Sequence, residues 1–439
     1  MTPKKPSLAE RTRVVHALRR KARDEAGLAS GHPLLRDIDR LEKSWDARAL
    51  KRIQKGLANY LARREGAVRV GDRVPPPGTF LGELALGHAH ALAGPGARVN
   101  LAASRLALGS IILGLIGTGK SHLVSILLRT LIATEPLARV LLLDPNRTYE
   151  ACCHDSTLWL NVPWESVRIN PLRAPKGYSY AKWIPQVFDY LARGELLHAR
   201  YFLVTRALEL FTAWMVPDID DGHAPVPSLF DLARDLRERR CKPGSKEEAY
   251  RQSALHVLHG RIETSGSVFD CNRGMEDLLT DTRVRIATDG LSPLETHRFF
   301  INALLHFSYR RRSLAGPGVC DNLLVTVIEE AASLLERRDH APMDFYQELF
   351  LRSRVLNIGY VLITQDLQSI HPAVFGGISN SFLFGMSSAA DKRLARHLLD
   401  LSVREEELLG ELGQGECFVK LAGHPTWPYP FIMKVNPHV

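Results

Sequence analysis

Residues 109–123 read Gly-Ser-Ile-Ile-Leu-Gly-Leu-Ile-Gly-Thr-Gly-Lys-Ser-His-Leu: a short apolar run, a glycine-rich turn, then a lysine and a hydroxyl. Residues 111–113 predict a buried strand, and residues 124–132 repeat apolar side chains at the spacing of one helix face. The turn therefore joins a strand to a helix N-terminus. This arrangement predicts a phosphate-binding loop, because backbone N–H groups and the helix dipole both favour an anion.

The spacing of glycine, lysine and serine in this turn is that of the Walker A motif. Lys120 is expected to reach the phosphates of a nucleoside triphosphate, and Ser121 to hold Mg²⁺. The predicted cofactors are therefore ATP and Mg²⁺. The residues predicted to contact the nucleotide are Gly114, Gly117, Thr118, Gly119, Lys120, Ser121 and His122.

The length of 439 residues predicts two or three domains. No apolar stretch approaches the roughly 20 residues that span a bilayer, and no signal peptide opens the sequence, so we expect a cytoplasmic protein. The six cysteines lack the paired spacing of a zinc site and are too sparse for a disulfide framework. The adjacent Cys152, Cys153 and His154 are not expected to bind a metal, since neighbouring cysteines chelate poorly.

The formal net charge of +9 lies in the first part of the chain. Residues 1–66 contain 17 Lys and Arg against 8 Asp and Glu, so the rest of the chain is neutral overall. Apolar side chains recur at helical spacing on both sides of Gly31-His32-Pro33, which predicts a basic helical pair. Such a pair indicates either contact with nucleic acid or an acidic partner, or a solvated charged face.

Buried parallel strands are indicated by apolar runs that end in polar residues. The run 139–143 ends in Asp144, which we expect at the carboxyl edge of the sheet, where ligands bind. The run 323–328 ends in Glu329 and Glu330, the Walker B arrangement. Glu329 is predicted to support Mg²⁺ and Glu330 to act as the catalytic base. A third run, 358–364, ends in Gln365, an amide expected to sense the γ-phosphate or the attacking water.

Composition divides the chain into four parts. The Pro-rich segment 74–78 marks a boundary, and residues 79–108 lead into the loop strand, with a short strand at 98–101. Residues 178–280 lack strong strand runs and read as a helical insertion, with helices near 201–215 and 229–240. The predicted parts are a basic helical segment, 1–74; a first core part, 75–177; the insertion, 178–280; and a second core part with C-terminal strands, 281–439.

Several motifs in order resemble the HerA/FtsK superfamily, especially HerA-like helicases and the ATPases of conjugative type IV secretion. They cover roughly residues 79–439 and are far more specific together than a lone phosphate loop. They are GLIGTGKS, LLLDP, Asn170-Pro171-Leu172, LLVTVIEEAASLL, RSRVLNIGYVLITQ, the run 378–386 and the segment 412–419, LGQGECFV.

The resemblance implies a RecA-like α/β core with a helical insertion, assembled as a hexameric ring that uses ATP to move DNA, expected to be double-stranded. It places Lys120 and Ser121 on Walker A and Gln365 on the sensor. It also places Arg354 on the arginine just before the sensor strand, which in such rings completes the neighbouring subunit's site. Two features depart from the family: Glu329-Glu330 replaces the usual Asp-Glu, and basic helices stand where HerA-like proteins carry a β-barrel.

The leading functional hypothesis is an ATP-driven DNA translocase or helicase. One alternative is an ATPase that energises protein or DNA transfer at a conjugative or secretion complex. Another is the ATPase subunit of a repair or anti-phage complex that recruits a nuclease, since the sequence carries no nuclease signature of its own.

Overall fold

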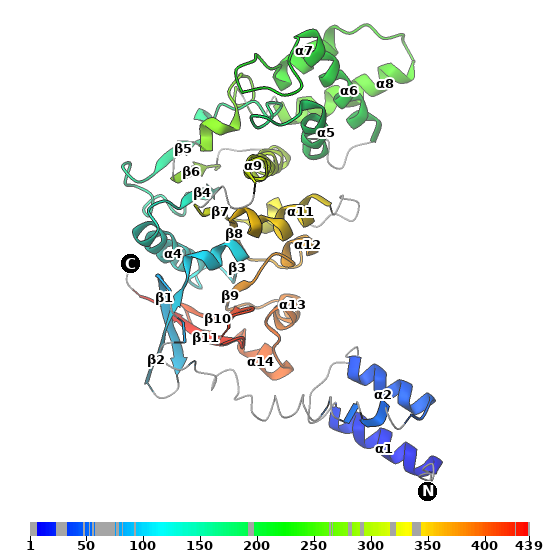
Figure 1. Cartoon of the computed structure of the whole chain (residues 1–439), viewed down its shortest axis with the longest axis vertical. Coiled ribbons are helices and arrows are strands. Elements are labelled where there is room, and N and C mark those ends of the chain that lie inside the picture. Colours follow the sequence, from blue (N-terminus) through cyan, green and yellow to red (C-terminus); the bar gives the residue numbers. More distant parts are fainter. Residues whose placement is uncertain are drawn as a thin grey trace.

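The computed structural model describes residues 7–22, 33–46, 49–51, 53–54, 57, 75, 79–80, 82–91, 94–191, 197–262, 265, 267–279, 283–289, 294–316, 322–335, 344–425 and 427–437. Within these ranges the strands form one eleven-stranded sheet along the length of the molecule (Figure 1). Its spatial order is β2-β1-β11-β10-β9-β3-β8-β7-β4-β6-β5.

The larger part of the sheet is parallel, which confirms the predicted α/β class with a mostly parallel sheet. Its strands are short and almost wholly buried, apart from β5 at the edge. They are β3 (Ser110–Leu113), β4 (Arg139–Asp144), β5 (Leu160–Pro163), β6 (Arg283–Ala287), β7 (Leu324–Ile328), β8 (Ile358–Thr364) and β9 (Asn380–Phe384).

Four antiparallel strands extend the sheet beyond β9: β10 (Glu416–Leu421), β11 (Phe431–Val435), β1 (Leu84–Ala91) and β2 (Gly94–Leu101). The sequence prediction was wrong for β1, which it left without a strand. The β1 sequence, LALGHAHA, lacks the β-branched residues that favour strands. Its Gly87 permits close approach of β11, because a Cβ there would lie 2.3 Å from the carbonyl oxygen of Lys434.

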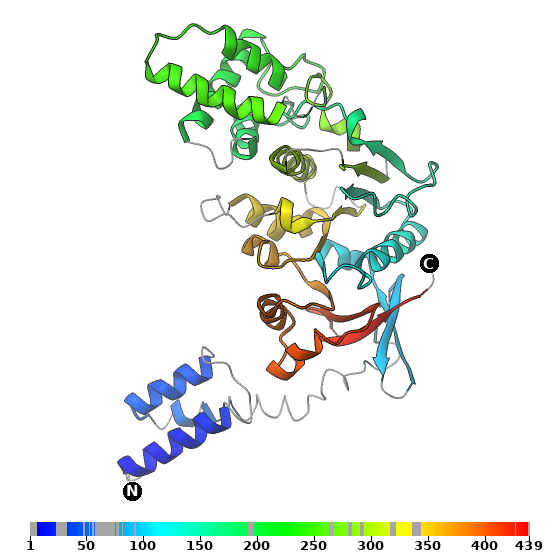
Figure 2. The same cartoon turned by 180° about the vertical axis from the view of Figure 1, so that it is seen from behind.

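Helices bury both faces of the parallel strands (Figures 1 and 2). Ile111 and Leu113 of β3 pack in one apolar cluster, whereas Ile112 between them packs in another. α4 covers the second face, and α9, α11 and α13 cover the first. This double coverage explains the continuous apolar runs in the strands. The helices are α4 (Lys120–Thr134), α9 (Leu294–Ala315), α10 (Ala331–Leu334), α11 (Asp344–Arg352), α12 (Pro372–Phe375), α13 (Ala389–Leu399) and α14 (Val403–Leu408).

A group of helices lies beyond the β5–β6 edge of the sheet (Figure 1). The apolar cluster under α9 continues into this group through Trp183, Leu203 and Leu232 without a break. The division of the chain at 178 and 280 therefore stays a prediction. The group contains α5 (Tyr180–Leu191), α6 (Leu197–Ala213), α7 (Leu229–Glu238) and α8 (Lys246–Ile262). The described chain also contains short 3-10 helices: η2 (Ala103–Leu108), η3 (Trp164–Ser166), η5 (Met275–Leu279) and η6 (Ser353–Leu356).

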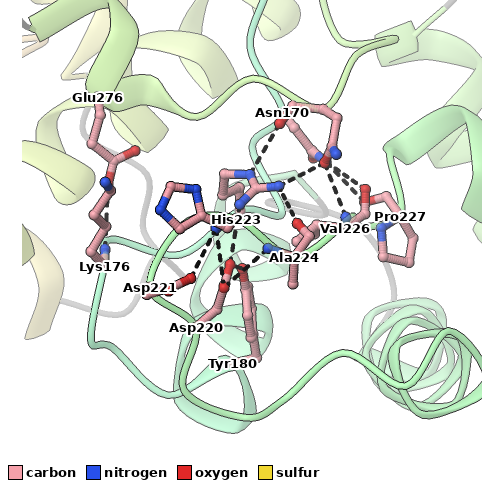
Figure 3. A network of polar contacts seen from close by, with 12 residues as sticks. Asn170, Lys176, Tyr180, Asp220, Asp221, His223, Ala224, Val226, Pro227 and Glu276 are labelled. Carbon is pink, nitrogen blue, oxygen red and sulfur yellow. Dashed lines mark hydrogen bonds and ion pairs between the residues drawn. The ribbon is translucent and has the colours of Figure 1, made fainter.

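A buried polar network fixes the loop between α6 and α7 (Figure 3). Arg173 is 4% exposed, forms an ion pair with Asp220 at 3.1 Å and donates to the carbonyl oxygen of Ala224 at 2.6 Å. Asn170 donates from its amide nitrogen to the carbonyl oxygen of Pro227 at 3.0 Å. Asn170, which belongs to one of the family motifs, thus has a structural role: it satisfies backbone groups that the irregular loop leaves unpaired.

The N-terminal helices have a small apolar core of their own and lie apart from the sheet (Figures 1 and 2). They are α1 (Leu8–Arg20) and α2 (Pro33–Lys43). Ser7 and Glu10 form a capping box at the start of α1, and Arg19 pairs with Asp39 and Glu42 of α2. Most of the predicted boundary at 74–78, the end of the predicted basic segment (58–74) and Cys320 lie outside the described residues.

Among the described helices, none is both long enough and apolar enough to cross a membrane.

Candidate functional site

The glycine-rich turn connects β3 to α4 at the carboxyl edge of the sheet. Gly119 has φ +115°, a conformation that L side chains rarely adopt, and it directly precedes the helix. A Cβ on Gly114 would lie 2.5 Å from the Cβ of Phe384. Glycine is thus required both for the turn itself and for its packing against β9.

The turn is held by the segments that follow β9 and precede β10. Leu115 donates its N–H to the carbonyl oxygen of Gly385 at 3.0 Å, and Gly415 donates to the carbonyl oxygen of Thr118 at 2.8 Å. The hydroxyl of Thr118 donates to the carbonyl oxygen of Leu115 at 2.8 Å. These contacts give the 412–419 motif a role, because its Gly415 donates a hydrogen bond that holds the phosphate-binding loop in place.

Lys120 folds over its own loop. Its Nζ donates to the carbonyl oxygens of Gly114 and Leu115 at 2.7 and 2.9 Å. Burial lowers the pKa of the ammonium, while the nearby charges of Glu330 and Glu329 oppose that shift. A partly desolvated cation held only by neutral carbonyls is suited to receive an anion, because a phosphate would supply stronger charge-assisted bonds.

The next two residues point to different surroundings. Ser121 is partly buried in the first turn of α4, and its hydroxyl lies beside the buried Tyr149. His122 is exposed, and its Nε2 lies 2.7 Å from the carbonyl oxygen of Asn436, at the end of β11. His122 therefore contacts the residue that follows β11, whereas Ser121 faces Tyr149 in the turn after β4.

Glu329, directly after β7, is a buried carboxyl group that forms no ion pair with the described residues. It is 7% exposed, and its Oε2 has no hydrogen-bond partner among the described residues. Burial and the charge of Asp144 raise its pKa to about 7, although the Thr148 hydroxyl and Lys120 favour the ionised form. Such an orphaned acid fits a cation site, because a bound cation would offset both the burial of the ionised carboxylate and its repulsion from Asp144.

Glu330 and Gln365 meet across neighbouring strands. Gln365, at the end of β8, donates from Nε2 to Oε1 of Glu330 at 3.2 Å. Glu330 has φ +54°, in the left-handed region that is costly for a side chain other than glycine. The turn after β7 thus points its two adjacent glutamates to different environments, one buried and one partly exposed.

Asp144 lies at the carboxyl edge as predicted, but it is fully buried and satisfied by the protein itself. It pairs with Nε of Arg285 at 2.8 Å and accepts from the backbone N–H groups of Thr148 and Tyr149 at 2.9 and 3.1 Å. Asp144 therefore lies at the edge where ligands were expected, and its own contacts there are with Arg285 and the turn after β4. Sequence reasoning missed Arg285, although an arginine within the apolar run 284–288 could have indicated a buried acidic partner.

Arg354 lies at the opposite edge of the sheet. It belongs to η6, just before β8 begins, and its charge lies near Arg105 of η2, which precedes β3. The seven residues of β8 therefore separate it from Gln365, a distance of roughly 20 Å at 3.3 Å per residue. Arg354 is exposed, while its neighbour Arg352 contacts Glu348 at 3.9 Å. It cannot complete the site of its own chain.

No group of three or more His, Cys, Asp or Glu side chains able to hold a metal is present in the part of the chain that the structure describes. Cys152 and Cys153 are free thiols.

Comparison with known families matches residues 89–174 to the family described as "Helicase HerA, central domain". The matched range contains the phosphate-binding loop, β4 and the turn after it. Together with the solved structures below, it confirms the resemblance indicated by the motifs. None of the curated proteins compared matches the sequence.

The fold is similar to that of VirB4 of Thermoanaerobacter pseudethanolicus, with a TM-score of 0.65 and 18% identity over 81% of this chain and 97% of VirB4. It is also similar to the bacterial conjugative coupling protein TrwB in an unbound form, with a TM-score of 0.56 and 13% identity over 77% of this chain and 87% of TrwB. For TrwB in complex with ADP and Mg²⁺, the TM-score is 0.55 at 15% identity, over 78% and 88% of the two chains. These similarities confirm the RecA-like fold.

Proposed function

We propose that this chain is an ATP-hydrolysing, ring-forming DNA translocase of the HerA–FtsK type. The observation that carries the proposal is the convergence at one sheet edge of Lys120 and Ser121 with Glu329, Glu330 and Gln365. These side chains come from three adjacent strand ends. Together they supply phosphate binding, cation binding and activation of a water, which are the parts that phosphoryl transfer to water requires.

ATP binding is supported by the loop geometry. The first N–H groups of α4 lack partners within the helix, and Lys120 lies where a phosphate could replace its carbonyl contacts. The residues present fit Mg²⁺: Ser121 would supply a hydroxyl and Glu329 a carboxylate whose buried Oε2 is otherwise orphaned. When bound, Mg²⁺ supplies positive charge to the terminal phosphates. The longer glutamate arm is thus compatible with the role that an aspartate has in most of the family.

Water activation is assigned to Glu330. Its carboxylate is more exposed than that of Glu329 and is oriented by the Gln365 amide. A carboxylate held this way can accept a proton from the attacking water, while the amide reports on whether the γ-phosphate is present.

Ring formation is supported by the position of Arg354, which is exposed and distant from the site of its own chain, where a neighbouring copy could receive it. Exposed apolar residues flank it: Leu351 is 48% and Val355 64% exposed. At the opposite edge, Ile116 on the phosphate-binding loop is 83% exposed. A head-to-tail contact that buries both surfaces would place Arg354 near the neighbour's ATP and, because it is heterologous, could close into a ring. We infer a homohexamer.

DNA is the proposed substrate, contacted by basic loops facing the ring channel and by the basic N-terminal segment. The experiment is electron microscopy of the protein with ATP and duplex DNA, combined with an ATPase assay with and without that DNA. Rings encircling DNA and DNA-stimulated hydrolysis are expected. Monomers whose hydrolysis ignores DNA would contradict the proposal.

A second candidate is an ATPase of a conjugative or type IV secretion complex. It is favoured by the extent of the VirB4 similarity, which covers 97% of that chain. Stable copurification with a membrane complex, with no directional movement on DNA, would favour this function over the first.

A further inference from the structure

The turn after β4 contacts both halves of the candidate site. The carboxylate of Asp144 accepts hydrogen bonds from the backbone N–H groups of Thr148 and Tyr149, so both residues are fixed at the edge of the sheet. Asp144 is itself held by Arg285 on the neighbouring strand β6. The turn is therefore rigidly attached beside Glu329, which follows β7 on the other side of β4.

Tyr149 is the residue of this turn without an explained role. Its side chain is 0% exposed, and its hydroxyl completes no hydrogen bond with any described residue. A buried hydroxyl without a partner destabilises the folded protein, because its hydrogen bonds to water are lost and not replaced. Phenylalanine would fill the same space without that cost, so the hydroxyl needs a reason.

The surroundings of the Tyr149 hydroxyl suggest a reason for its presence. Burial and the charge of Glu329 raise the pKa of Tyr149 well above its ordinary value, while the Ser121 hydroxyl opposes that shift. The turn that carries Tyr149 is bonded to the end of β4, next to β7, so the hydroxyl is close to the two residues that fit Mg²⁺. It can both accept and donate a hydrogen bond.

We propose that Tyr149 is a positioning residue that accepts a hydrogen bond from the Ser121 hydroxyl and donates one to Glu329 when Mg²⁺ is bound. A serine that ligates a cation through oxygen must direct its proton away from the cation, and Tyr149 offers the acceptor. The phenol proton then stabilises the ionised carboxylate. This inference rests on the proposed function, since it assumes Mg²⁺ at Ser121 and Glu329.

The test is Tyr149→Phe, with binding of a fluorescent ATP analogue measured over a Mg²⁺ titration and again in EDTA. Loss of an outer hydrogen-bond partner typically weakens metal affinity 10- to 100-fold. We expect the Mg²⁺ concentration for half-saturation to rise about tenfold, with binding in EDTA unchanged. The thermal stability of the nucleotide-free protein should stay the same or increase, because an unpaired buried hydroxyl is removed.

Tyr360→Phe is the matched control. Tyr360 on β8 is also buried, at 2% exposed, and its hydroxyl is likewise unpaired, but it lies toward the amino end of the strand, near Arg312. We expect this variant to leave the Mg²⁺ titration unchanged. A shift below twofold in Tyr149→Phe, an equal shift in Tyr360→Phe, or a less stable Tyr149→Phe protein would overturn the inference. If the wild-type protein itself shows no Mg²⁺-dependent nucleotide binding, the proposed function fails instead.

Discussion

The amide of Gln365 donates a hydrogen bond to the carboxylate of Glu330 at 3.2 Å, joining the ends of two neighbouring parallel strands. This contact orients the proposed base without involving Lys120, whose ammonium bonds to its own loop. In the proposed function, phosphate binding and water activation are therefore assigned to separate groups.

That separation predicts two distinct defects. Lys120→Ala should lose tight ATP binding, because it removes the cation that faces the phosphates. Glu330→Gln should keep ATP affinity and lose hydrolysis by at least about a hundredfold, the lower range for general base catalysis. Equilibrium binding of a labelled nucleotide and steady-state turnover measure the two effects. Normal turnover in Glu330→Gln would remove Glu330 from the base role.

The raised pKa of Glu329 predicts a pH-dependent stability. Its pKa is about 7 in the folded chain, against an ordinary value of 4.5. The folded state therefore holds the Glu329 proton more tightly than the unfolded state does. The contribution of this proton to the free energy of unfolding is fully present below about pH 4.5 and is lost as pH rises through about 7. Glu329→Gln, which cannot ionise, should be no more stable than wild type at pH 4, and more stable at pH 8.

Thermal melts of both proteins from pH 4 to pH 8, without nucleotide, measure this difference. Because Mg²⁺ competes with the proton for the carboxylate, the Mg²⁺ needed by the wild-type protein should also rise as pH falls below about 7. A stability difference between the two proteins that does not change with pH would show that Glu329 is not protonated at neutral pH.

The basic N-terminal segment predicts a salt-dependent contribution to DNA affinity. Deleting residues 1–66 should weaken duplex binding and flatten the plot of log affinity against log salt, by about 0.9 for each phosphate that the segment neutralises. Arg13→Gln with Arg36→Gln is the sharper variant, because both side chains are exposed and the apolar core of α1 and α2 remains intact. We expect it to reduce the slope by about 2, since two cations are removed. An unchanged slope in the deletion would indicate a protein-docking segment.

Sequence patterns predicted the centre of the fold because its parallel strands are buried on both faces. The runs at 139–144, 323–328 and 358–364 correspond to β4, β7 and β8, and the polar residues after them do meet at one edge. The prediction failed at β1, whose pairing with β2 and β11 depends on Gly87 rather than on strand-forming side chains.

The supporting parts of the site could not be predicted from local sequence. Arg285 pairs with Asp144 from more than 100 positions away, and Tyr149 is as far in sequence from Glu329, so no spacing rule connects the members of either pair. Asp144 followed the same pattern as Glu329, an acid after an apolar strand. The contacts with Arg285 and with the backbone N–H groups of Thr148 and Tyr149 distinguish the satisfied carboxylate of Asp144 from the orphaned one of Glu329.

The fourth prediction concerns Arg354, which we propose completes the active site of a neighbouring subunit. Arg354→Ala should keep ATP affinity and lose hydrolysis by a factor on the order of a thousand, as loss of an arginine finger does. Arg352→Ala is the matched control: its side chain is 72% exposed and contacts Glu348 at 3.9 Å, so its loss should change hydrolysis little. Equal loss in both variants would indicate a general defect of the surface rather than a finger.

The most direct measurement of a shared active site is the ATPase activity of mixtures of Glu330→Gln and Arg354→Ala subunits. Each variant alone lacks one half of every site. In mixed rings, some interfaces pair an intact Glu330 from one subunit with an intact Arg354 from its neighbour, so activity should reappear and reach its maximum at an intermediate mixing ratio. Mixtures that stay as inactive as either parent, under conditions where exchange of labelled subunits is observed, would contradict the account.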